Sequence, residues 1–428
     1  MRVMIVGGGG REHAIAWKLR QSPGLTELYC APGNAGIAAL ATCVDIAADD
    51  VRGLTAFAAG KKMDLVVVGP EVPLAMGLVD MLAEAGVRAF GPNIKCARLE
   101  ASKGFTKRFL ERHGIPTARY REFCDKDELL DHIGLFGFPM VLKADGLAAG
   151  KGVILAETPA EAREAIEDMM GRRVFGAAGD TVVVEEYLEG TEASMLCFVD
   201  GGAIVPMESA QDYKRAFDGD RGPNTGGMGS YSPSLLMDEA LEDEIREKIL
   251  APTYEGFKAD GLDFRGVLFI GLMLTEDGPK VMEFNNRFGD PETQAILPRL
   301  ESDLLDIFLA VTEDRLATRE LRWRADRSVC VVLAAGGYPG AYEKGKAIDG
   351  LARVDGDALV FHAGTAFKEG AGDVPHTAGG RVLGVTALGA THEEAREKAY
   401  ANAARIRFDG AQYRRDIGIV KEVRDCLP

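Results

Sequence analysis

Three mainly apolar segments in the first hundred residues each end directly in glycine, and helical stretches separate them. They span residues 3–6, 64–68 and 87–90. Because strands buried on both faces lose the alternation of apolar and polar residues, these segments predict a parallel sheet covered by helices. Ligands of such sheets bind beyond the carboxyl ends of the strands. We therefore expect a binding edge that includes the four glycines at 7–10.

The composition of the chain indicates which classes of partner, metal site and compartment it fits. The 428 residues include 50 Lys and Arg against 66 Asp and Glu, so the formal net charge is −16. Such a chain repels phosphate backbones, so we expect no nucleic-acid partner and no membrane partner. The seven cysteines form no C-x-x-C pair and the six histidines no i, i+4 pair, which predicts a reducing compartment and no zinc site. We expect a cytoplasmic protein without a signal peptide or membrane span.

The pattern of predicted strands, helices and loops changes near residue 102. A strand at 139–144, a glycine loop and a strand at 153–156 follow one another, and residues 212–232 form a long polar stretch without periodicity. Loops of that length are usually functional. Antiparallel strands are predicted at 266–274 and 280–284, and a further β-rich region begins near 321. We therefore predict domains at 1–101, 102–320 and 321–428.

Two familiar nucleotide motifs are absent. A dinucleotide fingerprint needs a third glycine where Glu12 or His13 stands, so a nicotinamide-dependent dehydrogenase is the weakest alternative. Residues 340–346 match G-x-x-x-x-G-K, but Ala347 replaces the Ser or Thr that would bind Mg²⁺. A glycine turn before a helix still offers backbone N–H groups to an anion.

The strongest local signal is the segment 143–153. It reads as a strand ending in Lys143, a loop of small residues containing Lys151, and another strand. Small residues let backbone N–H groups approach phosphate oxygens, and lysines supply positive charge. The alternative is an ordinary hairpin with a solvated lysine.

A second signal lies on the strand that ends near residue 285. Glu283 and Asn285 are two residues apart, so they share one face of a strand and offer two oxygen ligands to Mg²⁺. Arg287 follows on that face and could stabilise a phosphoryl oxyanion. A solvated hairpin face is the alternative. Together with the lysine loop, the pattern indicates metal-assisted phosphoryl chemistry.

Two further segments fit a nucleotide and a second substrate. A strand at 182–186 running into Tyr187 and Leu188 could border adenine, and Glu192 could accept ribose hydroxyls. In the long polar stretch, carboxylate, lysine and glycine residues suit a zwitterion or a sugar phosphate. An exposed strand end and a flexible surface loop are the respective alternatives.

Taken in order, these segments resemble the phosphoribosylamine–glycine ligase family of ATP-grasp enzymes over essentially the whole chain. The matching segments are residues 8–13, 32–36, 69–71, 143–152, 211–212, 223–229, 287–292 and 334–340.

The resemblance implies an α/β fold: an ATP-grasp core with a mobile lid at about 117–190, an N-terminal parallel α/β domain and a C-terminal β-rich α+β domain. It implies that ATP phosphorylates glycine to glycyl phosphate, and that 5-phosphoribosylamine displaces the phosphate to give glycinamide ribonucleotide. ATP, glycine and 5-phosphoribosylamine would be the substrates, Mg²⁺ or Mn²⁺ the cofactor, and a monomer is the expectation for the oligomeric state.

Residue roles follow from the same resemblance. Catalytic roles would fall to Arg287, Asp212 and Lys214, and metal binding to Glu283 and Asn285. ATP would contact Lys103, Lys143, Gly150, Lys151, Gly152, Glu185, Tyr187, Leu188 and Glu192. The other substrates would contact Gly10, Asn34, Glu71, Asn224, Gly226 and Asp290.

Two positions depart from the family pattern. Residues 271–274 offer no additional carboxylate for a metal, and Tyr213 stands where a histidine is frequent. Two other functions fit the same residues. One is a related ATP-grasp ligase that uses another acid or amine, and the other is a nucleotide-binding regulatory module without turnover.

Overall fold

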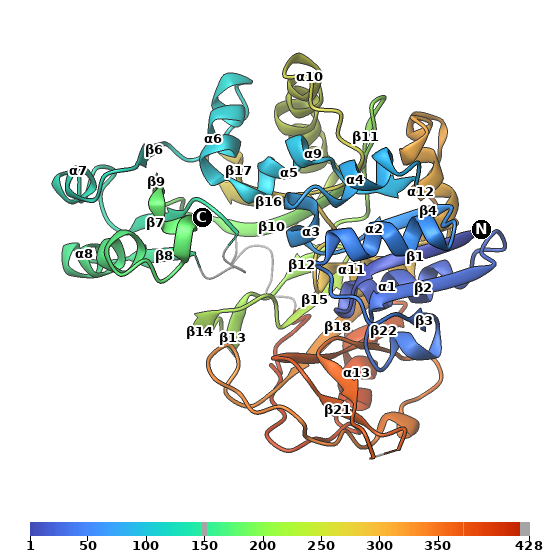
Figure 1. The fold of residues 1–428 in the computed structure, drawn as a ribbon. Helices are drawn as coiled ribbons and strands as arrows, with labels where there is room; N and C mark the ends of the chain where they lie inside the picture. The colour runs from blue at the N-terminus through green and yellow to red at the C-terminus, as the bar shows by residue number, and fades with distance from the viewer. Residues whose placement is uncertain (148–151, 371, 420–428) are drawn as a thin grey trace.

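The computed structural model describes residues 1–147, 152–370 and 372–419. A compact body holds both the N-terminal and C-terminal regions, and one lobe projects from it (Figure 1). The lobe contains strands β6–β9 and helices α7 and α8. Within the described residues, no helix has the length and apolar character needed to cross a membrane.

The N-terminal sheet is parallel, as predicted, with strand order β3-β2-β1-β4-β5. Its central strand β1 (Arg2–Gly7) is buried from its second residue on. The other strands are β2 (Glu27–Pro32), β3 (Thr42–Cys43), β4 (Leu65–Val68) and β5 (Ala89–Phe90), and the helices are α1 (Gly10–Leu19), α2 (Val51–Gly60), α3 (Glu71–Ala75), α4 (Leu78–Glu84) and α5 (Ile94–Ala101).

One predicted helix in this region is divided. The sequence suggested a helix near residues 74–85, but α3 and α4 meet at Gly77, whose φ is +82°. Glycine adopts this left-handed conformation without a Cβ penalty, so it permits the break.

Two antiparallel sheets form the central region. The lobe sheet has order β6-β9-β7-β8, from β6 (Tyr120–Phe123), β7 (Met140–Ala144), β8 (Val153–Ala156) and β9 (Val182–Glu186), with α7 (Lys126–Asp131) and α8 (Pro159–Ile166) beside it. The body sheet has order β11-β10-β16-β17, from β10 (Thr191–Val199), β11 (Ile204–Pro206), β16 (Gly266–Thr275) and β17 (Gly278–Asn285). Further helices of the body are α6 (Lys103–Arg112), α9 (Glu239–Ile245), α10 (Ala251–Ala259), α11 (Glu292–Ile296) and α12 (Leu304–Thr312).

The long polar stretch at 212–232 is more regular than the sequence suggested. It includes the hairpin β13 (Arg215–Phe217) and β14 (Arg221–Asn224), and β12 (Gln211–Asp212) and β15 (Gly229–Ser232) border it. The prediction of a loop without strands was wrong there. Strands of two to four residues are too short to show periodicity, and β15 is stabilised by pairing with β18, about a hundred residues later.

That pairing makes β12 and β15 part of the C-terminal sheet, whose order is β12-β15-β18-β22-β19. Its later strands are β18 (Arg327–Ala334), β19 (Leu359–His362) and β22 (Arg381–Gly389), and a separate small pair is β20 (Thr365–Phe367) with β21 (Pro375–Thr377). The predicted capped helix is present as α13 (His392–Ala403), whose Glu394 N–H donates to Thr391 Oγ1 at 3.2 Å. The α/β fold class inferred from the sequence is therefore confirmed.

The hydrophobic cores show which parts of the molecule pack together. One apolar cluster contains Ile5 of β1, Phe198 of β10 and Phe361 of β19, so the three sheets of the body share a core. The lobe has its own cluster, which includes Phe123, Leu142 and Val184. The lobe therefore packs around itself, and its side chains add little to the body core.

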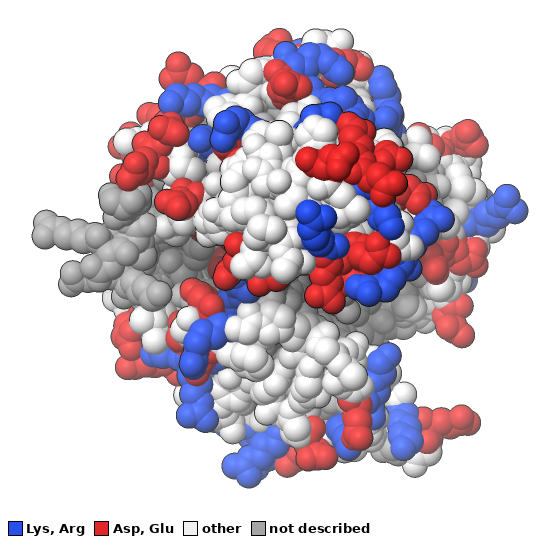
Figure 2. Space-filling model, turned by 90° about the vertical axis from the view of Figure 1, so that its left-hand side faces the viewer, with Lys and Arg blue, Asp and Glu red and all other residues white. Residues whose placement is uncertain are grey.

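Figure 2 shows the distribution of charged side chains on one face of the molecule. On the face shown in Figure 2, basic and acidic side chains of the described residues intermingle, and the middle of the face is hollowed. Positive charge available to an anionic ligand must therefore be local, as the acidic composition suggested.

Candidate functional site

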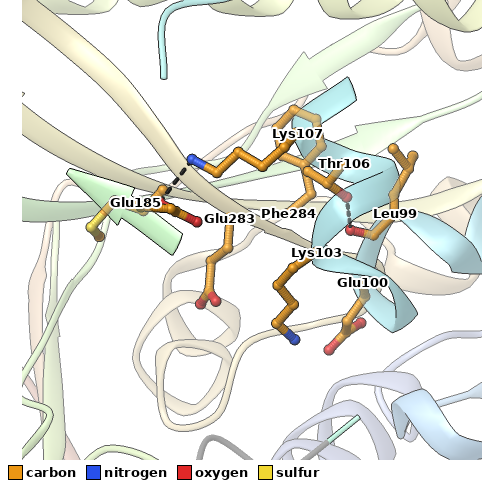
Figure 3. Close-up of a pocket in the computed structure, with 9 residues that line it drawn as sticks. Leu99, Glu100, Lys103, Thr106, Lys107, Glu185, Glu283 and Phe284 are labelled. Atoms are coloured by element: carbon orange, nitrogen blue, oxygen red, sulfur yellow. Dashed lines mark hydrogen bonds and ion pairs between the residues drawn. The ribbon is translucent and has the colours of Figure 1, made fainter. Parts of the chain in front are cut away.

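A pocket lies between the body and the lobe, where α6, β9 and β17 approach one another (Figure 3). Lys103, Glu100 and Glu283 extend in the same direction in this view. The lining residues are Leu99, Glu100, Lys103, Thr106, Lys107, Glu185, Met282, Glu283 and Phe284.

Glu185 is held between two lysines at one end of the pocket. Lys143 Nζ lies 2.8 Å from Glu185 Oε1, and Lys107 Nζ lies 2.8 Å from Glu185 Oε2. All three side chains are almost fully buried. Burial lowers the pKa of Lys107 to about 8, against the opposing effect of Glu185. Sequence reasoning missed Lys107, although its spacing of four from Lys103 places both on one helix face.

Glu283 lines the pocket from β17, and Asn285 stands two residues further along the same strand. Asn285 Nδ2 donates to Glu283 Oε1 at 3.2 Å, so both lie on one side of the strand. Burial favours the protonated form of Glu283, but Lys214, Lys103 and Lys143 outweigh it and lower its pKa to about 2. Glu283 is therefore ionised at neutral pH.

These two residues fit a divalent cation. An ionised carboxylate and an amide oxygen are hard ligands of the kind Mg²⁺ and Mn²⁺ accept. Within the described residues, no group of three or more His, Cys, Asp or Glu could hold a metal by itself. Gly271 of β16 stands opposite Glu283 in the register, so the neighbouring strand adds no carboxylate there. Water and ligand oxygens would have to complete the coordination.

Arg287 follows β17 and contacts two carboxylates from the N-terminal region. Its Nη2 lies 3.1 Å from Glu100 Oε1, and its Nε lies 3.5 Å from Glu71 Oε2. The same Glu71 oxygen lies 3.5 Å from Arg11 Nη2. Alternating charges therefore link α1, α3 and α5 to the end of β17. Arg11 and Glu100 were not among the predicted site residues.

Asp212 and Lys214 lie next to this strand. Lys214 Nζ is 3.1 Å from Glu192 Oε2, and Glu192, Asp212 and Glu283 together raise the lysine pKa against the effect of burial. Burial and the nearby Glu292 carboxylate raise the pKa of Asp212 well above its usual range. Asp212 Oδ1 is buried without a hydrogen-bond partner among the described residues. Tyr213 is directed elsewhere, since its hydroxyl accepts the N–H of Gly418 at 3.1 Å.

Asn34 is fully engaged by the protein. Its Nδ2 donates to Gly8 O at 2.9 Å and to His362 O at 2.8 Å. Its Oδ1 accepts the N–H groups of Gly36 and Ile37, each at 2.9 Å. This side chain joins the glycine turn to the C-terminal sheet, which leaves it no free polar group for a substrate.

Gly10 and Asp290 meet at the other side of the glycine turn. A Cβ on Gly10 would lie 2.4 Å from Gln294 Nε2, so only glycine permits this approach. Gln294 Nε2 donates to Asp290 Oδ1 at 2.8 Å, and the N–H of Arg11 donates to Asp290 Oδ2 at 3.3 Å. Arg381 and Arg11 lower the pKa of Asp290 although burial opposes them.

The remaining predicted residues that the structure describes stand at or next to the ends of β8, β9 and β14. Tyr187 is exposed directly after β9, Leu188 is half-buried, and Gly152 O accepts the N–H of Ala144 at 2.8 Å. Asn224 is exposed at the end of β14, and Gly226 follows it. Gly150 and Lys151 lie outside the described residues.

Family models match almost the whole chain. The N domain of phosphoribosylglycinamide synthetase matches residues 1–100, its ATP-grasp (A) domain residues 101–293 and its C domain residues 328–420.

Individual relatives named phosphoribosylamine–glycine ligase are similar to nearly the whole chain, in agreement with the family models. The phosphoribosylamine–glycine ligase of Caldanaerobacter subterraneus is 49% identical over 97% of this chain and 99% of its own length. That of Vibrio vulnificus is 50% identical over 98% of each chain. The crystal structure of the Thermotoga maritima phosphoribosylamine–glycine ligase superposes with a TM-score of 0.84 at 37% identity, covering 97% of this chain and all of the other. A biotin carboxylase from Campylobacter jejuni, at 13% identity and a TM-score of 0.74, shares the fold.

Proposed function

The chain belongs to the phosphoribosylglycinamide synthetase family and is an ATP-grasp ligase that joins glycine to phosphoribosylamine in purine biosynthesis, and we propose how its residues divide that reaction. The intermediate is glycyl phosphate. A glycine carboxylate oxygen attacks the γ-phosphorus of ATP, and ADP leaves. The amine of 5-phosphoribosylamine then attacks the acyl carbon, inorganic phosphate leaves, and the amine loses a proton.

The nucleotide lies in the pocket between body and lobe. We assign Lys103, Lys143, Gly150, Lys151 and Gly152 to its phosphates. We add Lys107 to the ATP-binding residues, because it forms an ion pair with the same carboxylate, Glu185, as Lys143 does. Glu185, Tyr187 and Leu188 border the adenine, and Glu192 accepts ribose hydroxyls.

Glu283 and Asn285 hold Mg²⁺ or Mn²⁺. The cation supplies neutralisation of the charge on the ATP phosphates. Arg287 binds the oxygens of the transferring phosphoryl group, and its two carboxylate contacts fix its orientation. Because phosphoryl transfer needs little covalent assistance, positioning and charge are the main contributions of these side chains.

Asp212 and Lys214 bind glycine. Lys214 attracts the carboxylate, and the unpartnered oxygen of Asp212 accepts from the ammonium group. Gly10, Glu71, Asn224, Gly226 and Asp290 surround the sugar amine. We assign Asn34 a supporting role, since its contacts hold the glycine turn.

We propose domain boundaries near residues 101 and 320, with the lid at about 117–190, a monomeric state and a cytoplasmic location. The separate core of the lobe supports the lid. Free cysteines at six positions, including buried Cys30 and exposed Cys43, support a reducing compartment.

The observation that carries these assignments is a pocket lined by Lys103, Lys107, Glu185 and Glu283. Glu185 forms ion pairs there with both Lys107 and Lys143. The test is phosphate release from ATP and Mg²⁺ with glycine and freshly generated phosphoribosylamine, added singly and together. Release that needs both, with one glycinamide ribonucleotide per phosphate, supports the proposed sequence of steps. Phosphate release at the full rate with glycine alone would contradict the proposed second step, in which the amine displaces the phosphate.

A further inference from the structure

Arg381 of the C-terminal sheet reaches two segments of the central region. Its Nη1 donates to Gly226 O at 2.5 Å and to Asp290 O at 2.6 Å, and Gly227 O accepts at 3.4 Å. The same nitrogen lies 3.4 Å from Asp290 Oδ1. One side chain therefore joins two segments that both carry residues assigned to the substrates.

An irregularity in the sheet accompanies this orientation. Arg381 is the first residue of β22 and pairs with Ala334, and the register of β18 and β22 shifts between Leu333 and Ala334. Such a bulge redirects the side chains at the end of a strand. The position of Arg381 thus depends on the C-terminal sheet, although its contacts lie in the central region.

The two segments are in close contact where Arg381 joins them. Gly227 has a φ of +110°, and a Cβ there would lie 2.4 Å from Pro291 Cδ. On the other side, the N–H of Gly226 donates to the Tyr338 hydroxyl at 3.1 Å. The C-terminal region therefore contacts both the carbonyl and the amide of Gly226.

These contacts extend to the side chains around the substrates. The N–H of Thr225 and its Oγ1 each donate to Lys214 O at 2.8 Å, so a displacement of Gly226 would pass to Lys214. Asp290 is followed after one residue by Glu292, the carboxylate that raises the pKa of Asp212. The ATP pocket, by contrast, does not include any residue that contacts Arg381.

We infer that Arg381 is a positioning residue for the glycine and amine half of the reaction, so that the C-terminal domain sets the geometry of the substrate loops. The inference rests on the proposed function for the identity of the two substrates. It differs from simple domain cohesion, because it requires an effect on glycine and phosphoribosylamine that ATP does not share.

The experiment compares Arg381→Ala and Arg381→Lys with Arg353→Ala, a control in the same domain whose side chain pairs with Asp349 on the surface. Steady-state kinetics are measured with each of the three substrates varied in turn. For Arg381→Ala we expect kcat/KM for glycine and for phosphoribosylamine to fall roughly 100-fold, with KM for ATP within about threefold of the original. Arg353→Ala should match the unmodified enzyme.

Arg381→Lys separates positioning from folding. Because all recorded contacts converge on one nitrogen, a lysine ammonium can replace part of them, and we expect activity between the original and Arg381→Ala. Millimolar guanidinium should restore part of the turnover of Arg381→Ala and leave Arg353→Ala unchanged.

Unaltered kinetics of Arg381→Ala, or an equal loss for ATP and glycine, would overturn the inference. If Arg381→Ala does not fold, the ratio of the glycine and ATP effects in Arg381→Lys decides in the same way. Failure of the proposed function can be distinguished from failure of this inference. It would appear in the unmodified enzyme, as phosphate release that does not depend on both glycine and phosphoribosylamine.

Discussion

Glu100 connects the N-terminal region to the end of β17 through two different groups. Its Oε1 lies 3.1 Å from Arg287 Nη2, and its Oε2 accepts the N–H of Asn286 at 2.7 Å. Asn286 Nδ2 in turn donates to Cys96 O at 2.9 Å on the same helix. The arginine assigned to the phosphoryl group is therefore oriented by a carboxylate from another domain.

We predict that Glu100→Gln lowers kcat about tenfold and changes the dissociation constant of ATP little. The amide can still accept from Asn286, but it no longer attracts Arg287 with a full charge, so the guanidinium loses its fixed orientation. Stopped-flow phosphate release and calorimetry with ATP measure the two quantities. Glu128→Gln, which removes an exposed partner of Arg121, is the control. A normal kcat in Glu100→Gln would contradict the role of this pair.

Removing Lys143 should weaken ATP binding. Lys143→Met keeps the length of the side chain but leaves Glu185 with Lys107 as its single lysine partner, and it removes a cation assigned to the phosphates. A charge-assisted contact of this kind corresponds to about 1.5–3 kcal/mol, or a roughly 10- to 150-fold weaker dissociation constant. Calorimetry checks the value, with Lys126→Met in the same lobe as the control. An unaltered dissociation constant would remove Lys143 from the ATP site.

Asn285→Ala should raise the concentration of Mg²⁺ needed for half-maximal turnover by about tenfold, because one of two protein oxygen ligands is lost. Asn285→Asp supplies a carboxylate at the same position, so its Mg²⁺ concentration for half-maximal turnover should return to that of the unmodified enzyme. Turnover is measured across a Mg²⁺ titration at saturating ATP. Identical titration curves for Asn285→Ala and the unmodified enzyme would exclude Asn285 as a ligand.

The elements that the sequence predicted share a strong local signal. Strand β4 and residues 3–6 of β1 are continuous apolar runs. The period of two in β17 places Glu283 and Asn285 on one side. The prediction of an ATP-grasp core came from the family resemblance, and the match to the ATP-grasp domain model confirms it. Both kinds of information are contained in short, uninterrupted segments.

The residues that sequence reasoning missed depend on long-range contacts. Glu100 and Asn286 are 186 residues apart, and Arg381 and Gly226 are 155 apart. A single acidic or basic residue on a helix or strand has no local feature that reveals such a partner. Asn34 is the opposite case. The resemblance implied that it binds a substrate, but in the structure its side-chain amide is hydrogen-bonded to backbone groups.

Acid should destabilise the enzyme through buried His13. Burial lowers the pKa of His13 to about 3, with the neighbouring His362 adding to the effect, and its Nδ1 accepts the N–H of His362 at 2.7 Å. The unfolded chain takes up this proton near pH 6.5, whereas the folded protein does so only near pH 3. Below pH 6.5 the unfolded state therefore binds more protons, and stability falls as pH falls, by about 1.4 kcal/mol per pH unit for one such group.

We predict that His13→Asn lowers stability at pH 7 and reduces the slope of unfolding free energy against pH by one proton between pH 6 and 4. Asparagine cannot be protonated, so the difference in stability between the two proteins should shrink as pH falls. Urea unfolding at several pH values measures the slope. His376→Asn, whose imidazole lies on the surface with its Nδ1 2.8 Å from Val374 O, should leave that slope unchanged. Equal slopes in His13→Asn and the unmodified enzyme would show that His13 is protonated alike in both states.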